Sequence, residues 1–270
     1  MKIFCTLLFA GTSFLFFPTD LAHASSEKAQ NIISSGEKQM RGNSSQSTMR
    51  MVIKRPTYER ELLLRAWAVG LEKAVVEILK PAKEEGVVSL RLEQNMWNYL
   101  PKTDQVVRVP SSLMLQSWMG SDFTNDDLMK ASSLSRDYTH TILKNEMIRG
   151  ENTVLIECLP RPNAPVVWGK VLYWARTEDN LPVRQRFYDD KGKLVRTLDF
   201  SAFKKMDDRI IPTELRIEKA DGTQEATTVT YEKTLFDREI PSRIFSQNEI
   251  KDISQRGKVA SFGWFTERLN

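Results

Sequence analysis

Short segments in which apolar and polar residues alternate, separated by turn residues, dominate the chain from about Ser47 onward. In residues 47–54, Met49, Met51 and Ile53 fall on one face, and Arg50 falls on the other. A period of two is typical of a strand with one buried face. Similar segments follow at 60–69, 72–79, 87–93, 95–101, 152–158, 166–175, 182–188, 194–200, 213–219 and 225–232.

Turn residues between these segments indicate how the strands are connected. Residues 189–192 (Asp-Asp-Lys-Gly) and 221–222 (Asp-Gly) combine residue types that tolerate positive φ, so each predicts a hairpin. Strands at this spacing, without intervening helices, predict an antiparallel sandwich or barrel. We therefore expect a mainly β protein with a few helices, whose sheet domain covers residues 47–270.

Helical patterns are confined to two places. Residues 29–39 predict a short N-terminal helix, followed by a flexible connector at 42–47, so that residues 25–46 precede the sheet domain. Residues 110–118 have apolar groups at helical spacing behind a serine cap, and Asn125 begins a run that can start a helix at Leu128. The stretch near 110–135 is thus a predicted helical or irregular insertion between two halves of the sheet.

The first 24 residues have the pattern of a secretory signal peptide. Lys2 is followed by an apolar run at 3–17, a proline at position 18, and Ala-His-Ala at 22–24. The apolar run is shorter than the roughly 20 residues that a spanning helix needs, although an uncleaved anchor is the alternative. Cleavage after Ala24 predicts a protein that works outside the cytoplasm and retains enough chain for one large core.

Charge and the rare reactive side chains exclude several classes of function. The net charge is +4, and Lys and Arg are interspersed with Asp and Glu, so no nucleic-acid footprint is present. The mildly basic surface predicts transient contact with anionic membranes, and ordinary solubility is the alternative explanation of the charge. Cleavage of the signal would leave Cys158 and His140 as the only cysteine and histidine. No internal disulfide, zinc cluster or Cys–His pair follows from that spacing, and Cys158 is predicted to be a core residue of a strand.

Catalytic and metal patterns are weak. Ser121, Asp122 and His140 could supply a nucleophile, an acid and a base for a hydrolase, but no nucleophile elbow surrounds the serine. Asp122, Asp126 and Asp127 lack the alternation of a calcium loop, and helix capping explains Asp126 better. The sequence therefore predicts a protein that is not an enzyme and holds no cofactor or metal.

Large apolar side chains accumulate in the middle of the chain. Methionine and aromatic residues build adaptable apolar pockets. We therefore interpret this region as the lining of a cavity for acyl chains, with the 110–135 insertion as its lid, while ordinary core packing is the alternative. The predicted lining residues are Met96, Trp97, Tyr99, Leu113, Met114, Trp118, Met119 and Phe123.

Several motifs resemble one family. Residues 96–101 (Met-Trp-Asn-Tyr-Leu-Pro) and 119–123 (Met-Gly-Ser-Asp-Phe), followed by Asp127-Leu128, are similar to the outer-membrane lipoprotein-sorting proteins of the LolA-like superfamily of periplasmic lipoprotein carriers. Smaller matches extend the resemblance over roughly residues 30–250; they are Pro81-Ala82, Gly86, Arg108, Asp137-Tyr138, Pro182-Val183, the 194–200 strand, Pro212-Thr213 and the 240–245 segment.

The resemblance implies a strongly curved antiparallel sheet, an unclosed barrel, with helices covering its mouth. It also implies a monomeric periplasmic carrier that takes lipid or lipoprotein acyl chains from an inner-membrane transporter or release complex to an outer-membrane acceptor. A lipid-sensing regulatory module that binds a dedicated partner is the alternative on the same fold. The final residues, 258–270, lie outside the resemblance and are predicted to be a last strand or helix, or a docking tail.

Overall fold

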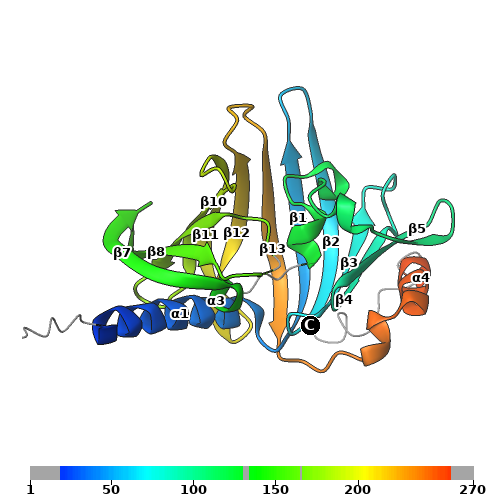
Figure 1. The fold of residues 1–270 in the computed structure, drawn as a ribbon. Coiled ribbons are helices and arrows are strands. Elements are labelled where there is room, and N and C mark those ends of the chain that lie inside the picture. The colour runs from blue at the N-terminus through cyan, green and yellow to red at the C-terminus, as the bar shows by residue number, and fades with distance from the viewer. Residues whose placement is uncertain (1–18, 130–133, 165, 257–270) are drawn as a thin grey trace, which may run out of the picture.

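A computed structural model describes residues 19–129, 134–164 and 166–256, with side chains from Ser25 onward. It contains one antiparallel sheet in the order β6-β5-β4-β3-β2-β1-β13-β12-β11-β10-β9-β8-β7 (Figure 1). The sheet is not closed into a barrel, which confirms the unclosed form and not the sandwich or closed barrel. Its strands are β1 (Ser44–Lys54), β2 (Glu59–Val69), β3 (Lys73–Lys80), β4 (Val88–Leu92), β5 (Asn95–Leu100), β6 (Gln105–Arg108), β7 (Tyr138–Ile148), β8 (Glu151–Pro160), β9 (Lys170–Arg176), β10 (Pro182–Tyr188), β11 (Leu194–Met206), β12 (Arg209–Lys219) and β13 (Ala226–Phe236).

The strand order explains why the middle of the chain crosses the sheet. Consecutive strands pair with each other, except β6 with β7. Because β1 pairs with β13, the two halves of the chain meet at the centre of the sheet. Strands β6 and β7, which flank the predicted insertion, are therefore the two opposite edges. The chain from β6 to β7 must pass from one edge to the other, and this path carries the segment 109–129, called the insertion below.

The sheet has two differently covered faces. We call inner face the one that bears Met51, Leu62 and Met96, and the insertion covers it. Helix α1 (Thr19–Arg41) covers the β7–β9 end of the same face, where Ala29 and Ile33 are fully buried. On the outer face, α4 (Gln247–Arg256) packs on β3–β5 (Figure 1).

The N-terminal helix is longer than predicted. It begins at Thr19 and runs continuously through residues 22–24, where the signal cleavage is expected, and residues 1–18 lie outside the described part of the chain. The predicted connector is shorter than expected because β1 already starts at Ser44. Gly36 permits the close approach of α1 to the sheet, since a Cβ there would lie 2.4 Å from the carbonyl oxygen of Asn180.

Most predicted strands are confirmed, and the main differences are these. Strand β6 was not predicted, because it is short and mostly exposed. Strand β7 was not predicted, because its exposed edge residues dilute the alternation. Strand β9 starts at Lys170 and not at 166, since the preceding residues form a loop around Gly169. The helix predicted at 110–118 is wrong: only a 3-10 turn, η1 (Ser111–Leu113), forms there, and η2 (Trp118–Gly120) and α2 (Asn125–Met129) follow before α3 (Leu134–Asp137).

The remaining short helix, η3 (Ser242–Phe245), leads into α4. The predicted tail at 258–270 lies outside the described residues. Among the helices that are described, none is both long enough and apolar enough to span a membrane.

Candidate functional site

Five of the eight predicted lining residues lie in one apolar cluster between the insertion and the inner face of the sheet. Met96 and Trp118 are buried there, and the other three are partly buried beside sheet residues such as Ile53 and Leu64. The five are Met96, Met114, Trp118, Met119 and Phe123. The structure therefore brings methionine and aromatic side chains together between the insertion and the sheet.

The other three predicted lining residues lie elsewhere. Trp97 and Tyr99 alternate with Met96 along β5, so they point to the outer face and pack beneath η3 and α4 with Phe245. Leu113 is 36% exposed on the outside of the insertion. The sequence could have predicted the placement of Trp97 and Tyr99, because residues 95–100 form a strand and a strand cannot place residues 96 and 97 on one face.

Trp118 anchors the insertion on the sheet. Its side chain is 2% exposed, and its indole N–H donates a hydrogen bond to Ser89 Oγ on β4 at 3.1 Å. Ser89 in turn donates to Asn98 Oδ1 on β5 at 2.7 Å. The polar edge of the ring is thus satisfied inside an apolar cluster, which allows the large side chain to be buried without an unpaired donor.

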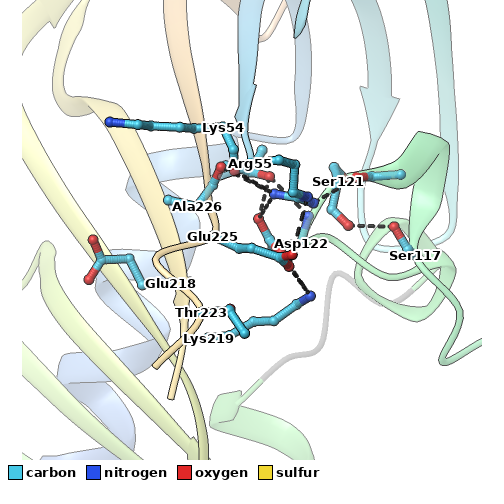
Figure 2. A network of polar contacts seen from close by, with 12 residues as sticks. Lys54, Arg55, Ser117, Ser121, Asp122, Glu218, Lys219, Thr223, Glu225 and Ala226 are labelled. Atoms are coloured by element: carbon cyan, nitrogen blue, oxygen red, sulfur yellow. Dashed lines mark hydrogen bonds and ion pairs between the residues drawn. The ribbon is translucent and has the colours of Figure 1, made fainter. Parts of the chain in front are cut away.

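A buried ion pair fixes the middle of the insertion, and Figure 2 shows it from close by. The Asp122 side chain is 1% exposed, and its Oδ2 accepts hydrogen bonds from Arg55 Nη1 at 3.0 Å and from Thr227 Oγ1 at 2.7 Å. Its backbone N–H donates to the same Thr227 hydroxyl at 2.9 Å. Lys219 Nζ lies 3.6 Å from Oδ1 and also pairs with Glu225 at 2.5 Å. The carboxylate is therefore bound to the loop after β1 and to both strands of the β12–β13 hairpin.

Two arginines also hold the backbone of η2. Arg55 Nη2 donates to the carbonyl oxygen of Gly120 at 2.7 Å. Arg60, in β2, donates to the carbonyl oxygen of Met119 and pairs with Glu84 at 3.4 Å. Charged donors form strong hydrogen bonds with backbone carbonyls, so this irregular turn is fixed in place without any sheet pairing to the strands beneath it.

A second ion pair holds the end of the insertion. Arg196 of β11 donates to both carboxylate oxygens of Asp127, each at 2.6 Å. Its guanidinium lies 4.6 Å from the ring centroids of Trp168 and Phe187, a cation–π arrangement. Burial would raise the pKa of Asp127, but the adjacent Arg196 guanidinium outweighs it and holds that pKa below its usual value. Asp127 is therefore charged at neutral pH.

A pocket opens beside this second ion pair. It has a volume of about 230 Å³ and lies between α2, the start of β7, the loop around Trp168 and the inner face of β10–β12. Its wall is mostly apolar, with Gln185, Asp126, Asp127 and Arg196 as polar groups. Pockets for small ligands usually measure about 300–1,000 Å³, so this pocket is smaller than a typical ligand site.

The hydrolase residues considered above do not converge. Ser121 Oγ donates to the carbonyl oxygen of Trp118, Asp122 faces Arg55, and His140 Nε2 lies 2.8 Å from the carbonyl oxygen of Leu134. Asp122 and Asp127 each form an ion pair with an arginine, so neither carboxylate is free to bind calcium.

His140 and Cys158 do meet, as cross-strand neighbours on β7 and β8, which the sequence spacing did not reveal. Burial raises the pKa of the Cys158 thiol, so it remains protonated and is not a nucleophile.

His140 is expected to make the protein less stable in mild acid. Its Nε2 must donate to the Leu134 carbonyl, and its buried Nδ1 has no hydrogen-bond partner among the described residues, so burial lowers the pKa of the imidazole below 6.5. The unfolded chain then takes up the proton first, and this contribution to stability is present above the ordinary pKa and lost as pH falls through the lowered one.

Urea denaturation between pH 7 and pH 5, on the wild type and on His140→Gln, tests this expectation. The variant should lose less stability on acidification than the wild type. Equal slopes would contradict a role for His140.

Sequence analysis missed Arg55, Arg196 and Thr227, which bind the insertion. A signal for Arg196 was present, because it shares its parity in β11 with the inward-facing Leu198 and Phe200. A buried charged residue on an apolar face needs a partner of opposite charge, so the position of Arg196 in the strand could have indicated an ion pair. Arg55 lies in a loop beyond β1 and carries no comparable pattern.

Comparisons with known proteins agree with this architecture. A family model described only as an uncharacterized protein matches residues 70–252, more than half of the chain. A DUF1329 family protein from Desulfovibrio piger is 20% identical, with a TM-score of 0.77 over 84% of this chain and 99% of that chain. A LolA superfamily protein from Nitrosomonas europaea is 24% identical, with a TM-score of 0.69 over 82% and 98% of the two chains. The chain belongs to the family of that model, and its fold is the LolA-like fold.

A further solved structure has the same architecture. It is described as an outer membrane lipoprotein-sorting protein domain from Vibrio parahaemolyticus, and it is 23% identical, with a TM-score of 0.73 over 84% and 99% of the two chains. No curated protein matches the sequence. At these identities the structural neighbours establish the fold alone.

Proposed function

We propose that the protein is a carrier that binds lipid, or the acyl chains of lipoproteins, on the inner face of its sheet beneath the insertion. The observation that carries the proposal is the way in which the insertion covers this face. It places methionine and aromatic side chains on an apolar sheet surface, yet it is held by two arginine–aspartate pairs and by arginine contacts to carbonyl oxygens. Such polar contacts can exchange with water while the apolar cluster exchanges with cargo.

The energies support reversible binding. Each methylene group that leaves water contributes about 0.8 kcal/mol, so an enclosed acyl chain competes with a bilayer. Displacing the insertion costs the contacts of Trp118 and its neighbours, which lowers the net affinity for cargo. A carrier needs this balance, because cargo that is bound too tightly is not released.

The proposed location is the periplasm, after export and cleavage following Ala24. An inner-membrane transporter or release complex would load the carrier, and an outer-membrane acceptor would receive its cargo. The motif resemblance and the names of the structural neighbours support this transfer route. The carrier has no proposed catalytic role, cofactor or metal.

Polar substitutions in the lining are expected to weaken lipid binding. Met114→Lys and Trp118→Asp place a charge in the apolar cluster, which an acyl chain cannot compensate. Titration with a fluorescent fatty acid should show a loss of roughly tenfold or more in affinity for each variant. Met147→Lys is the matched control, because Met147 is 68% exposed on the edge strand β7. Equal affinities in all three variants would contradict the assignment of the lining.

Native mass spectrometry of the protein purified from a bacterial periplasm tests the proposal without assuming a ligand. The carrier is expected to retain acylated species at near one-to-one stoichiometry, which lipid extraction would identify. An empty protein that also fails to take up fatty acid would contradict the carrier and favour a module that binds only proteins.

A further inference from the structure

The outer side of residues 109–121 carries no charged side chain and exposes two leucines. Residues 109–121 contain no Asp, Glu, Lys, Arg or His, in a chain of which 27% is charged. Residues 111–117 are exposed except for Met114, and they include Leu113 and Leu115, which are 36% and 59% exposed. Because 27% of the chain is charged, an uncharged run as long as residues 109–121 is unusual, and this run includes the two exposed leucines.

Neighbouring groups extend this surface. Val107 of β6 is 44% exposed shortly before the run, and Tyr58 is 54% exposed at the tip of the β1–β2 hairpin. Arg55 of the same hairpin contacts Gly120 of η2, so the tip lies against the insertion. Exposed cationic side chains lie beside the surface at Lys54 and Arg108.

We propose that this surface docks on a lipid bilayer. Leucine, valine and tyrosine side chains beside uncharged serine and glutamine suit the interface of a membrane, and flanking Lys and Arg favour anionic headgroups. A protein partner would gain directional complementarity from charges, and the run offers none. The bilayer is therefore the occupant that these residues fit best.

The position of this surface links docking to cargo transfer, and this link rests on the proposed function. Leu113 and Leu115 are exposed on the outside, while Met114 between them packs in the inner cluster. The same short segment therefore faces the membrane on one side and the cargo site on the other. Docking would bring the bilayer to the part of the protein that must move for cargo to leave.

Vesicle flotation with phosphatidylethanolamine and phosphatidylglycerol tests the docking surface. The Leu113→Asp/Leu115→Asp variant should partition roughly tenfold less strongly than the wild type, because two apolar contacts become charged. Val195→Asp/Ile210→Asp is the matched control, since these residues are 37% and 43% exposed on β11 and β12. The control should float like the wild type, and thermal melts should show all three proteins folded.

Fatty-acid uptake without vesicles separates this proposal from the carrier function. Uptake should be the same in both double variants, since none of the four residues lies in the inner cluster. Uptake together with flotation that does not depend on Leu113 and Leu115 would overturn the docking surface alone. Leucine-dependent flotation without any uptake would support docking and overturn the carrier. A wild type that does not float would overturn docking.

Discussion

Replacing Asp122 with alanine is expected to lower the free energy of unfolding by about 3 kcal/mol and to release the insertion from the sheet. The substitution leaves the largely buried Arg55 without its closest carboxylate and the Thr227 hydroxyl without an acceptor. The loss should fall at the lower end of the range for a broken buried pair, because Glu225 remains 3.8 Å from Arg55 Nε. Urea denaturation measures the stability, and hydrogen exchange at the amides of residues 118–124 measures the release.

Asp190→Ala, an exposed aspartate in the β10–β11 turn, is the control and should change neither quantity. Asp122→Asn should be milder than Asp122→Ala, since an amide oxygen can still accept the Thr227 hydrogen bond. If Asp122→Ala were as stable as the wild type, with unchanged exchange in the insertion, the ion pair would not be what holds the insertion closed.

Replacing Trp118 with alanine is expected to cost about 3–5 kcal/mol of stability and yet to strengthen fatty-acid binding by about tenfold. The indole is the largest side chain that the insertion contributes to the inner cluster, and its removal leaves apolar space against Ser89 and Met96. An acyl chain can fill that space without first displacing the ring. Chemical denaturation and a fluorescent fatty-acid titration measure the two effects on the same protein.

Trp174→Ala provides the matched control. Trp174 is 4% exposed on the outer face, and its indole donates to Glu146 at 2.8 Å, so its loss should cost a similar amount of stability. It should leave the affinity for fatty acid unchanged, because its cluster lies on the other side of the sheet. A loss of stability at Trp118 without a gain in affinity would mean that this tryptophan is ordinary core.

The strands were predictable from the sequence because apolar and polar residues alternate along each strand that buries one face. Met49, Met51 and Ile53 alternate in the sequence and lie on the inner face, and the Asp-Gly turn at 221–222 joins β12 to β13. The path of the insertion was not predictable in this way. It follows from the pairing of β1 with β13, which places β6 and β7 at opposite edges and is a long-range contact without a local signal.

The candidate site shows the same division. Composition indicated that residues 96–123 were rich in lining side chains, but strand alternation sends Trp97 and Tyr99 to the face beneath α4. The partners of Asp122 and Asp127 come from distant strands, and their spacing in the sequence carries no information about the contact. A charged residue on the apolar face of a strand, such as Arg196, is a sequence pattern that predicts a buried ion pair, although it does not identify the partner.

The most direct test asks whether the insertion must leave the inner face for cargo to bind. Asp122 and Thr227 are in side-chain contact, so the Asp122→Cys/Thr227→Cys variant offers a disulfide that locks the insertion to β13, while Cys158 remains a buried thiol. Fluorescent fatty-acid uptake would be measured on the same protein before and after reduction. We expect no uptake while the disulfide is intact and uptake once it is reduced. Equal uptake in both states would contradict a cargo site beneath the insertion.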